Sequence, residues 1–366
     1  MTMIDPAIVP QRTLYTGAKM PAVGMGTFGS DHADADAVSA SVAGALRVGY
    51  RSFDCAACYG NEDMIGKIFA DAFAEGIVKR EELFIASKVW NDMHGDGDVL
   101  IACAKTLKDL KLDYLDMYYV HWPFPNYHAP HCDVDSRNPD SKPFTVERFM
   151  KTWRQMERLV DMGLTKHIGM SNMTIPKLEA VLPLCRIKPA AIEMELHPCF
   201  QQPELFDYCR AHGIEVVGFC PIGSPERPER DKMPEDIADI ELPELKAIAA
   251  AHGVHPAVIC IKWAVQRGAS PIPFSLKEKN YTMNLKCVTE DPLTEEEMAS
   301  LGFHREEDVL VDFEVGDMVV VISGAWKDTV GAIKAINDSK KTITMHVEMF
   351  GRETPVELGF AEVKKM

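Results

Sequence analysis

Residues 190–220 read AAIEMELHPCFQQPELFDYCRAHGIEVVGFC, and this stretch decides the fold class. Two β-rich runs, Ala190–Leu196 and Ile214–Cys220, flank a helical pattern at Glu204–His212. The helical pattern ends at Gly213, as helices commonly do. A strand, a helix and a second strand in this order predict two parallel strands joined by a crossover helix.

The same alternation of strand and helix extends over about 250 residues, from Val23 to Phe274. Eight strands are predicted, at Val23–Thr27, Tyr50–Asp54, Leu83–Val89, Leu115–His121, Lys166–Ser171, Ala190–Leu196, Ile214–Cys220 and Pro271–Phe274. Helical patterns between them include Asp36–Val48, Asn61–Phe73, Asp98–Leu110, Val146–Met162, Glu204–His212 and Pro256–Arg267. Eight such units match a closed (β/α)8 barrel, the TIM barrel, better than an open doubly wound sheet.

Other segments depart from this regular alternation. The segment Arg12–Met20 is typical of a hairpin that plugs the lower end of the barrel. Two insertions, Phe124–Pro143 and Ile222–Leu242, follow the fourth and seventh strands, so we expect them to form walls or lids at the face where barrel enzymes place their active sites.

The character of the sequence changes near residue 303. A capping pattern at Thr294–Glu297 predicts a last helix. From Phe313 the chain is β-rich and punctuated by glycine, which is typical of a small all-β barrel. We therefore predict a barrel domain at 1–302, a linker at 303–312 and a second domain at 313–366.

The composition of the chain argues against some classes of function. The 39 Lys and Arg against 55 Asp and Glu give a net charge of −16, which repels phosphate backbones and anionic membranes, so a nucleic-acid role is not expected. Apolar runs fall far short of the roughly 20 residues that cross a bilayer. No export signal is legible, so the ten Cys are expected to be reduced thiols and the location cytoplasmic.

Four polar residues lie at or just past the ends of the second, third and fourth predicted strands: Asp54, Tyr59, Lys88 and His121. In a barrel these ends meet at one mouth. A tyrosine is a poor acid at neutral pH, but a nearby ammonium such as Lys88 stabilises its phenolate and lowers the pKa. Asp54 would hold the ammonium, and His121 would hydrogen-bond a carbonyl oxygen.

Each of these residues alone has a packing role as the more ordinary alternative. Cys55 and Cys58 have the spacing of a redox pair, but we interpret them as incidental thiols because no thioredoxin-like context surrounds them. His128, His131 and Cys132 lack ordered zinc-ligand spacing, so no metal is predicted.

The strings around the four residues closely resemble the aldo-keto reductase family. They are Tyr50–Glu62, Ser87–Trp90, Asp113–Asp116 and Val120–Pro123, followed by Gly169–Asn172, Glu195–Pro198 and Phe219–Ser224. The resemblance covers about Val9 to Gly302. It implies a (β/α)8 barrel that transfers hydride from NADPH to an aldehyde or ketone, with Tyr59 as proton donor, Lys88 and Asp54 tuning it, and His121 orienting the carbonyl.

The resemblance also implies the cofactor contacts. Ser171 and Asn172 would hold the nicotinamide carboxamide, and Phe219 would stack on its ring in place of the usual Tyr. The full set of predicted cofactor residues is Thr27, Asp54, Ser171, Asn172, Glu193, Phe219, Cys220, Ile222, Ser224, Phe274, Ser275 and Asn284. Phe28, Trp90, His121 and Trp122 are the predicted substrate contacts.

Departures from the family pattern affect cofactor binding. Glu193 stands where the family has Gln, and a carboxylate accepts but does not donate, so we expect altered affinity. Phe274 and Asn280 replace the Lys and Arg that grip the 2′-phosphate. Lys277 and Lys279 are possible substitutes, so NADPH is expected first and NADH is the competitor.

The substrate and the tail complete the expectations. Phe53–Ala57 and Gly76–Glu81 look most like the plant aldose-6-phosphate and aldose reductase branch, which implies a sugar or sugar phosphate. The tail resembles the KOW domain of the transcription factor NusG, on Gly316–Asp317, Gly324, Gly331 and Phe350–Glu357. A protein partner is favoured over nucleic acid there, and a passive appendage or a barrel-docking lid are equal alternatives. The rival function is a cofactor-binding regulatory protein that turns over slowly.

Overall fold

The computed structural model describes residues 3–30, 32–125, 142–223, 227, 238–302, 314–322, 329–337, 342–349, 352–359 and 362–365. Contacts divide the chain into two compact units, Met1–Arg305 and Glu306–Met366, and each is described by itself. Ser224, Gly324, His128, His131 and Cys132 lie outside the described residues, as do most of the two predicted insertions.

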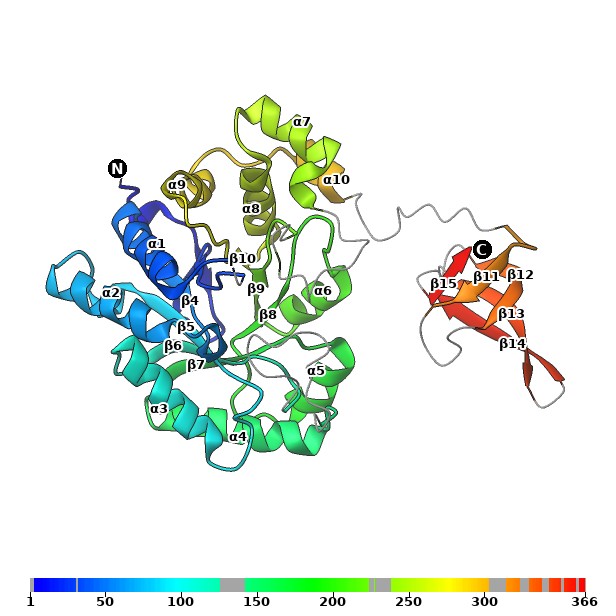
Figure 1. Ribbon diagram of the computed structural model, residues 1–366, viewed down its shortest axis with the longest axis horizontal. Helices are drawn as coiled ribbons and strands as arrows, with labels where there is room; N and C mark the ends of the chain where they lie inside the picture. The colour runs from blue at the N-terminus through cyan, green and yellow to red at the C-terminus, as the bar shows by residue number, and fades with distance from the viewer. Residues whose placement is uncertain are drawn as a thin grey trace. The chain divides into compact units, whose positions relative to one another are not determined.

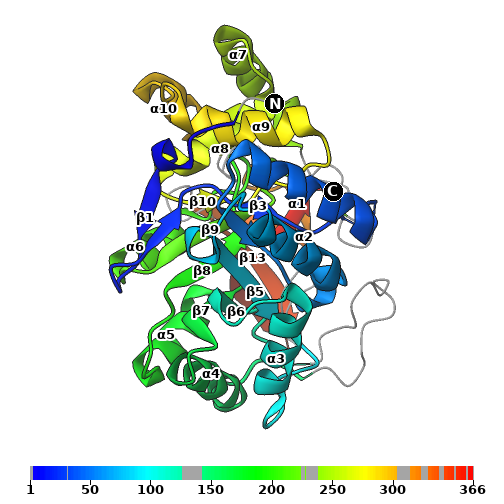
Figure 2. The same ribbon diagram turned by 90° about the vertical axis from the view of Figure 1, so that its left-hand side faces the viewer.

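The first unit is built on a sheet of eight parallel strands, which lie at its centre with helices around them (Figures 1 and 2). In sheet order these are β3 (Met25–Gly26), β4 (Ser52–Asp54), β5 (Phe84–Val89), β6 (Leu115–Val120), β7 (Thr165–Ser171), β8 (Ala191–Glu195), β9 (Glu215–Phe219) and β10 (Ser270–Pro271). The ring closes where Gly24 N–H donates to Pro271 O and Gly26 N–H donates to Pro273 O, each at 3.1 Å. The predicted barrel is confirmed.

Helices follow the strands in the predicted alternation. The described α-helices are α1 (Ala35–Val48), α2 (Glu62–Ala74), α3 (Asp98–Leu110), α4 (Val146–Asp161), α5 (Ile175–Val181), α6 (Pro203–Ala211), α7 (Pro243–His252), α8 (Pro256–Arg267), α9 (Glu278–Lys286) and α10 (Glu295–Gly302). At the start of α10, Thr294 N–H donates to Glu297 and Glu297 N–H donates to Thr294 Oγ1, which is the predicted capping box.

The N-terminal hairpin pairs β1 (Gln11–Thr13) with the antiparallel β2 (Lys19–Pro21). Leu14 and Met20 are buried in one cluster with Phe84, at the start of β5, and Ala190, just before β8. The hairpin therefore packs into the end of the barrel at which the strands begin, as expected, and the opposite end remains for the site.

A glycine inside the barrel makes room beside the site. A Cβ on Gly169, in β7, would lie 2.3 Å from the ring of Tyr119, which no real contact tolerates. Tyr119 is paired in register with Lys88 on the neighbouring strand β5. Gly169 therefore allows a large aromatic ring to fill the interior at the level of Lys88.

The second unit is an antiparallel five-stranded sheet. Its order is β14 (Arg352–Gly359), β13 (Thr342–Met349), β12 (Val330–Asn337), β11 (Met318–Val321) and β15 (Val363–Lys365). A separate small core holds Val319, Val321, Ile333, Ile343 and Met345. The prediction of an all-β character for the tail is therefore confirmed.

Helix length and hydropathy bear on membrane association. Within the described residues, no single helix is long and apolar enough to cross a bilayer. One pair, α7 and α8, meets the test only when its members are joined, and the two helices are bent by 93° at the break between them.

Candidate active site

Three neighbouring strands bring the four predicted catalytic residues together. Asp54 ends β4, Lys88 lies next to the last residue of β5, and His121 directly follows β6. Tyr59 ends a short 3-10 turn, Ala57–Tyr59, that begins just after β4. Because neighbouring strands of a parallel barrel end at the same face, residues up to 67 positions apart in the sequence meet here.

Lys88 is the centre of the site. Its side chain has no exposed surface, and its ammonium donates to Asp54 Oδ2 and, at 3.1 Å, to the carbonyl oxygen of Cys55. The Tyr59 hydroxyl lies 3.5 Å from the same nitrogen, and Glu193 Oε1 lies 3.4 Å from it. The predicted ammonium beside the phenol is therefore present, and it also forms ion pairs with the two carboxylates of Asp54 and Glu193.

These contacts set the charges of the site. Burial acts to lower the pKa of Lys88, but Asp54 and Glu193 outweigh it and hold that pKa well above its ordinary value. Burial raises the pKa of Tyr59 well above 10, and the charge of Lys88 only offsets part of this rise. The expectation that Lys88 makes the phenol acidic is therefore not met here, because burial disfavours the phenolate more strongly than the ammonium favours it. Tyr59 therefore keeps its proton at neutral pH.

The imidazole of His121 is held from three sides. The rings of Tyr59 and Trp90 meet it edge-on, with centroid distances of 5.9 and 5.0 Å. On the third side, Cys58 Sγ lies 3.6 Å from His121 Nδ1. These contacts fix the ring plane relative to the phenol next to it.

Residues at the end of β3 support the same group. Thr27 Oγ1 donates to the carbonyl oxygen of Asp54 at 2.8 Å, and the Asn61 amide donates to Thr27 O at 2.9 Å. The ring of Phe28 packs against Tyr59 with centroids 5.1 Å apart. Thr27, predicted to contact cofactor, therefore holds the backbone that carries Asp54.

The residues predicted to hold the nicotinamide carboxamide are adjacent. The Asn172 side chain donates to His121 O at 2.9 Å and to Ser171 Oγ at 3.2 Å, and Asn172 N–H donates to Glu193 O. Asn172 has a φ of 57°, a left-handed conformation that costs free energy outside glycine. Strained backbone of this kind is concentrated at binding sites, and here it places an amide between β6, β7 and β8.

Glu193 gives the site one more carboxylate than its ammonium can balance. Asp54, Lys88 and Glu193 are 4%, 0% and 2% exposed, so ionising both acids would leave a net negative charge in the interior. Burial and the charge of Asp54 raise the pKa of Glu193 to about 8, while Lys88 acts to lower it. Burial also raises the pKa of Asp54, against the pull of Lys88. A carboxyl whose pKa is about 8 keeps its proton at neutral pH, so Glu193 adds no second negative charge there.

The remaining predicted cofactor residues lie past the later strands. Phe219 ends β9, and Cys220 follows it with a φ of 51°, accepting a hydrogen bond from Gly223 N–H. Phe219, Cys220 and Ile222 are all partly exposed.

A second group of predicted cofactor residues lies beyond β10, around helix α9. Ser275 Oγ accepts from Asn280 Nδ2 and from Lys277 N–H, both at 3.2 Å. Asn284, in α9, is nearly buried, and Phe274 packs against the core as a partly buried side chain. Lys277 and Lys279 are exposed at this helix start.

Sequence reasoning passed over two residues of the site. Glu62 is buried behind it and accepts hydrogen bonds from Ser87 at 2.6 Å and Thr106 at 3.0 Å. Cys58 was set aside as an incidental thiol, yet it faces His121. The available signal was position alone, since both residues stand within three places of Tyr59.

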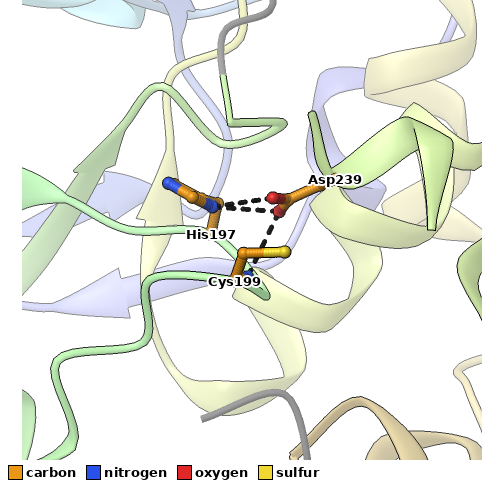
Figure 3. Close-up of side chains that lie close together, drawn as sticks. All are labelled: His197, Cys199 and Asp239. Atoms are coloured by element: carbon orange, nitrogen blue, oxygen red, sulfur yellow. Dashed lines mark hydrogen bonds and ion pairs between the residues drawn. The ribbon is translucent and has the colours of Figure 1, made fainter. Parts of the chain in front are cut away.

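A series of ionic contacts joins the end of β8 to Arg227 and Asp239, which follow β9 in the sequence. His197 Nδ1 donates to Asp239 at 2.9 Å, its Nε2 lies 3.5 Å from Glu195, and Glu195 pairs with Arg227. Burial acts to lower the pKa of His197, but its two carboxylate partners raise it to about 9. Figure 3 shows the carboxylate of Asp239 facing both His197 and Cys199, and the N–H of Cys199 also donates to it. The carboxylates of Asp239 and Glu195 thus accept from the donors around them, and together these residues form an ion-pair anchor.

Comparisons with known proteins agree with this geometry. The Aldo/keto reductase family profile matches residues 22–305. An aldo/keto reductase of Synechocystis is 40% identical, covering 79% of this chain and 86% of that relative. Aldo-keto reductase family 1 member A1 of Xenopus tropicalis is 40% identical over 80% of this chain and 88% of its own.

Two solved structures share the fold. The aldose reductase of Schistosoma japonicum is 33% identical with a TM-score of 0.71, covering 81% of this chain and 92% of its own. The Bombyx mori aldo-keto reductase, solved in complex with NADP, is 30% identical with a TM-score of 0.72, covering 81% and 93%.

A barrel that presents a buried ammonium, a phenol and an imidazole at one mouth is the scaffold of a carbonyl reductase. The chain belongs to the aldo/keto reductase family. Members of this family are NAD(P)H-dependent oxidoreductases, and so is this protein.

Proposed function

We propose that this protein reduces an aldehyde or ketone to the alcohol, with Tyr59 as the proton donor. The observation that carries the proposal is the meeting of Tyr59, Lys88, Asp54 and His121 at one end of the barrel. A carbonyl that accepts hydride becomes an alkoxide, whose charge must be met by a proton or by preorganised donors. The four residues supply both.

The roles follow from the contacts. His121 donates a hydrogen bond to the carbonyl oxygen and orients it toward Tyr59, whose ring lies edge-on to it. Tyr59 then gives its proton to that oxygen. The phenolate left behind lies beside the ammonium of Lys88, which Asp54 and the Cys55 carbonyl hold in place. Because the ammonium is fixed before the reaction, little reorganisation is needed when the phenolate forms.

The residues present fit a nicotinamide cofactor. Among the described residues, none donates a hydrogen bond to Glu193 Oε2, a buried oxygen that a carboxamide NH2 would satisfy. Ser171 and Asn172 stand next to it, and Phe219 offers a ring face for stacking. When bound, the cofactor supplies the hydride that the side chains cannot.

We propose NADPH as the reductant, with NADH as the competitor. In place of a Lys and Arg clamp, the start of α9 presents the exposed Lys277 and Lys279, which attract a 2′-phosphate as point charges. The double substitution Lys277→Ala with Lys279→Ala should weaken NADPH binding about tenfold and leave NADH binding unchanged, measured by fluorescence titration. An equal loss for both cofactors, or none, contradicts this assignment.

An aldose or aldose phosphate is the proposed substrate class. The support is the aromatic rings near the four residues, which suit a sugar's apolar face: Phe28 packs on Tyr59, Trp90 meets His121, and Trp122, which follows His121 in the sequence, stacks on Phe124.

The test is NADPH consumption with a panel of simple aldehydes, aldoses and aldose phosphates. Turnover of at least one class by the purified chain supports the proposal, and loss of that turnover in Tyr59→Phe assigns the proton donor. Tight cofactor binding without turnover on any member favours the rival function, a cofactor-binding regulatory protein.

For the second unit we propose a KOW-like domain that binds a protein partner. Three of its apolar side chains, Met318, Ile322 and Val330, are 48%, 45% and 47% exposed. Met318 lies in β11 and Val330 in the neighbouring strand β12, where Met318 pairs with Ala332, two residues from Val330, and Ile322 directly follows β11. The double substitution Met318→Glu with Val330→Glu should abolish partner binding, assayed by co-purification with the full-length chain, and leave carbonyl reduction unchanged. Lost turnover would instead indicate a role in the barrel's own reaction.

A further inference from the structure

We propose that Cys58 is a positioning residue: its thiol donates a hydrogen bond to His121 Nδ1 and thereby fixes the imidazole as the tautomer that carries its proton on Nε2. The inference rests on the proposed function, in which His121 donates to the carbonyl oxygen. It assigns a role to a residue that the mechanism above leaves unused.

The geometry places the thiol on one ring nitrogen only. Cys58 Sγ lies 3.6 Å from His121 Nδ1, within the range for a hydrogen bond that involves sulfur. The same short turn that carries Cys58 also carries Tyr59, whose ring meets the imidazole edge-on at 5.9 Å. Successive residues of one turn therefore contact the same ring, Cys58 through its thiol and Tyr59 through its aromatic ring.

The thiol is present as S–H throughout the working pH range. Burial raises the pKa of Cys58 well above its ordinary value, the carboxylates of Glu62 and Asp92 raise it further, and the ammonium of Lys88 only partly opposes them. A protonated thiol has a hydrogen to donate, whereas its sulfur is a weak acceptor.

The consequence concerns which nitrogen faces the substrate. A neutral imidazole has one N–H donor and one acceptor nitrogen, and the partner of one nitrogen determines which of them carries the proton. A thiol that donates to Nδ1 makes Nδ1 the acceptor, so Nε2 carries the hydrogen. That is the hydrogen required to donate to a carbonyl oxygen.

The first experiment observes the tautomer directly. Protein labelled with 15N-histidine, with NADPH bound and without it, is compared as wild type, Cys58→Ala and Cys58→Ser, and His121 resonances are assigned with His121→Asn. We expect a neutral ring protonated on Nε2 in the wild type, the same state in Cys58→Ser, and a mixture of tautomers in Cys58→Ala. A wild-type ring protonated on Nδ1, or no change in Cys58→Ala, overturns the inference.

The second experiment measures the effect on the reaction. Cys58→Ala should lower kcat about three- to tenfold with the KM for NADPH unchanged, because the donor to the carbonyl is only partly lost. Cys58→Ser should restore most of kcat, since a hydroxyl also donates. Cys58→Val, which keeps the bulk without the donor, should match Cys58→Ala; wild-type kcat in Cys58→Val would show that the thiol acts by packing and would overturn the inference.

A matched control variant completes the design, and the two readouts distinguish failure of the Cys58 inference from failure of the proposed function. Cys185 is a partly buried thiol outside the site that donates to Val181 O, and Cys185→Ala should leave both kcat and the His121 resonances unchanged. The tautomer readout does not require turnover. An inactive protein with the expected tautomers would therefore count against the proposed function alone, whereas an active protein with unchanged tautomers would count against Cys58 alone.

Discussion

Lys88 Nζ lies 3.5 Å from the Tyr59 hydroxyl, but its hydrogen bonds to Asp54 and to the Cys55 carbonyl are shorter. The ammonium is therefore held mainly by Asp54 and the Cys55 carbonyl, and its contact with the phenol is the longer one. Before the reaction Tyr59 is a protonated, weakly acidic group, because burial raises its pKa. The ammonium matters most once a phenolate has formed, since only then does it face an opposite charge at that oxygen.

Removing the phenol hydroxyl should stop the reaction without disturbing cofactor binding. Tyr59→Phe keeps the ring that packs on Phe28 and His121. We expect kcat to fall at least a hundredfold, the usual contribution of a positioned general acid, while the Kd for NADPH stays within about twofold. Stopped-flow reduction and fluorescence titration measure the two quantities, and Tyr208→Phe, at a partly buried tyrosine of α6 outside the site, is the control. Wild-type turnover in Tyr59→Phe would falsify the assignment.

The pH dependence of cofactor binding should report Glu193. Below about pH 8 its carboxyl keeps a proton and can both donate and accept, like the amide that the family has there. Above that pH the second carboxylate forms beside Asp54, and NADPH binding should weaken several-fold between pH 7 and 9.5. Glu193→Gln cannot ionise, so its Kd should stay flat over this range and match the wild type at pH 7. If both proteins follow the same pH course, another group is responsible.

The ion-pair anchor at His197 should make stability depend on pH in a defined direction. The folded pKa of about 9 lies above the unfolded value of 6.5, so the pair stabilises the fold fully below pH 6.5 and loses this contribution as pH rises through 9. Asp239→Asn should cost roughly 2 kcal/mol in the free energy of unfolding at pH 6 and much less at pH 10.

Denaturant titrations at the two pH values measure this difference. Glu241→Gln is the matched control, because it breaks an exposed pair with Lys246 in the same segment and should change stability by less than about 1 kcal/mol at either pH. A cost for Asp239→Asn that is constant with pH would mean that His197 is not the group whose charge matters.

Truncation after Gly302 should leave a folded and active barrel. The two units have separate cores, and the last barrel helix, α10, is already held where the Gln201 amide donates to Leu301 O at 2.8 Å. We expect the truncated chain to keep wild-type kcat and a melting temperature within a few degrees. Aggregation of the truncated chain, seen by light scattering, would show that the second unit is needed for the barrel to fold.

Most strand positions were predictable because they depend on local sequence, but the last strand is Ser270–Pro271 where Pro271–Phe274 was predicted. The predicted strand at Lys166–Ser171 and the observed β7 differ by one residue at the start, and the helix at Asp98–Leu110 matches residue for residue. Local composition and terminating residues suffice for such elements. The meeting of Asp54, Lys88 and His121 then follows from barrel topology alone.

The pKa shifts of the site residues were not predictable from the sequence, because they depend on how deeply each side chain is buried. Sequence shows that Lys88 can approach Tyr59, but only the folded barrel shows that burial outweighs the ammonium in setting the phenol's pKa. The pairing of Lys88 with Glu193 likewise crosses the barrel from β5 to β8, at a distance that no sequence spacing encodes. The contact of Cys58 with His121 likewise joins residues 63 positions apart, which the spacing of Cys55 and Cys58 does not encode.

The closure of the ring between Gly24 and Pro271, and between Gly26 and Pro273, has a bearing on biosynthesis. Translation has reached all four predicted catalytic residues once His121 is added, yet the residues that close the ring, Pro271 and Pro273, are added about 150 positions later. A nascent chain stalled between these points carries the four predicted catalytic residues, but it has neither the closed ring nor the predicted cofactor residues Ser275 and Asn284. The nascent chain should therefore gain its reductase activity in one step, late in translation, rather than gradually.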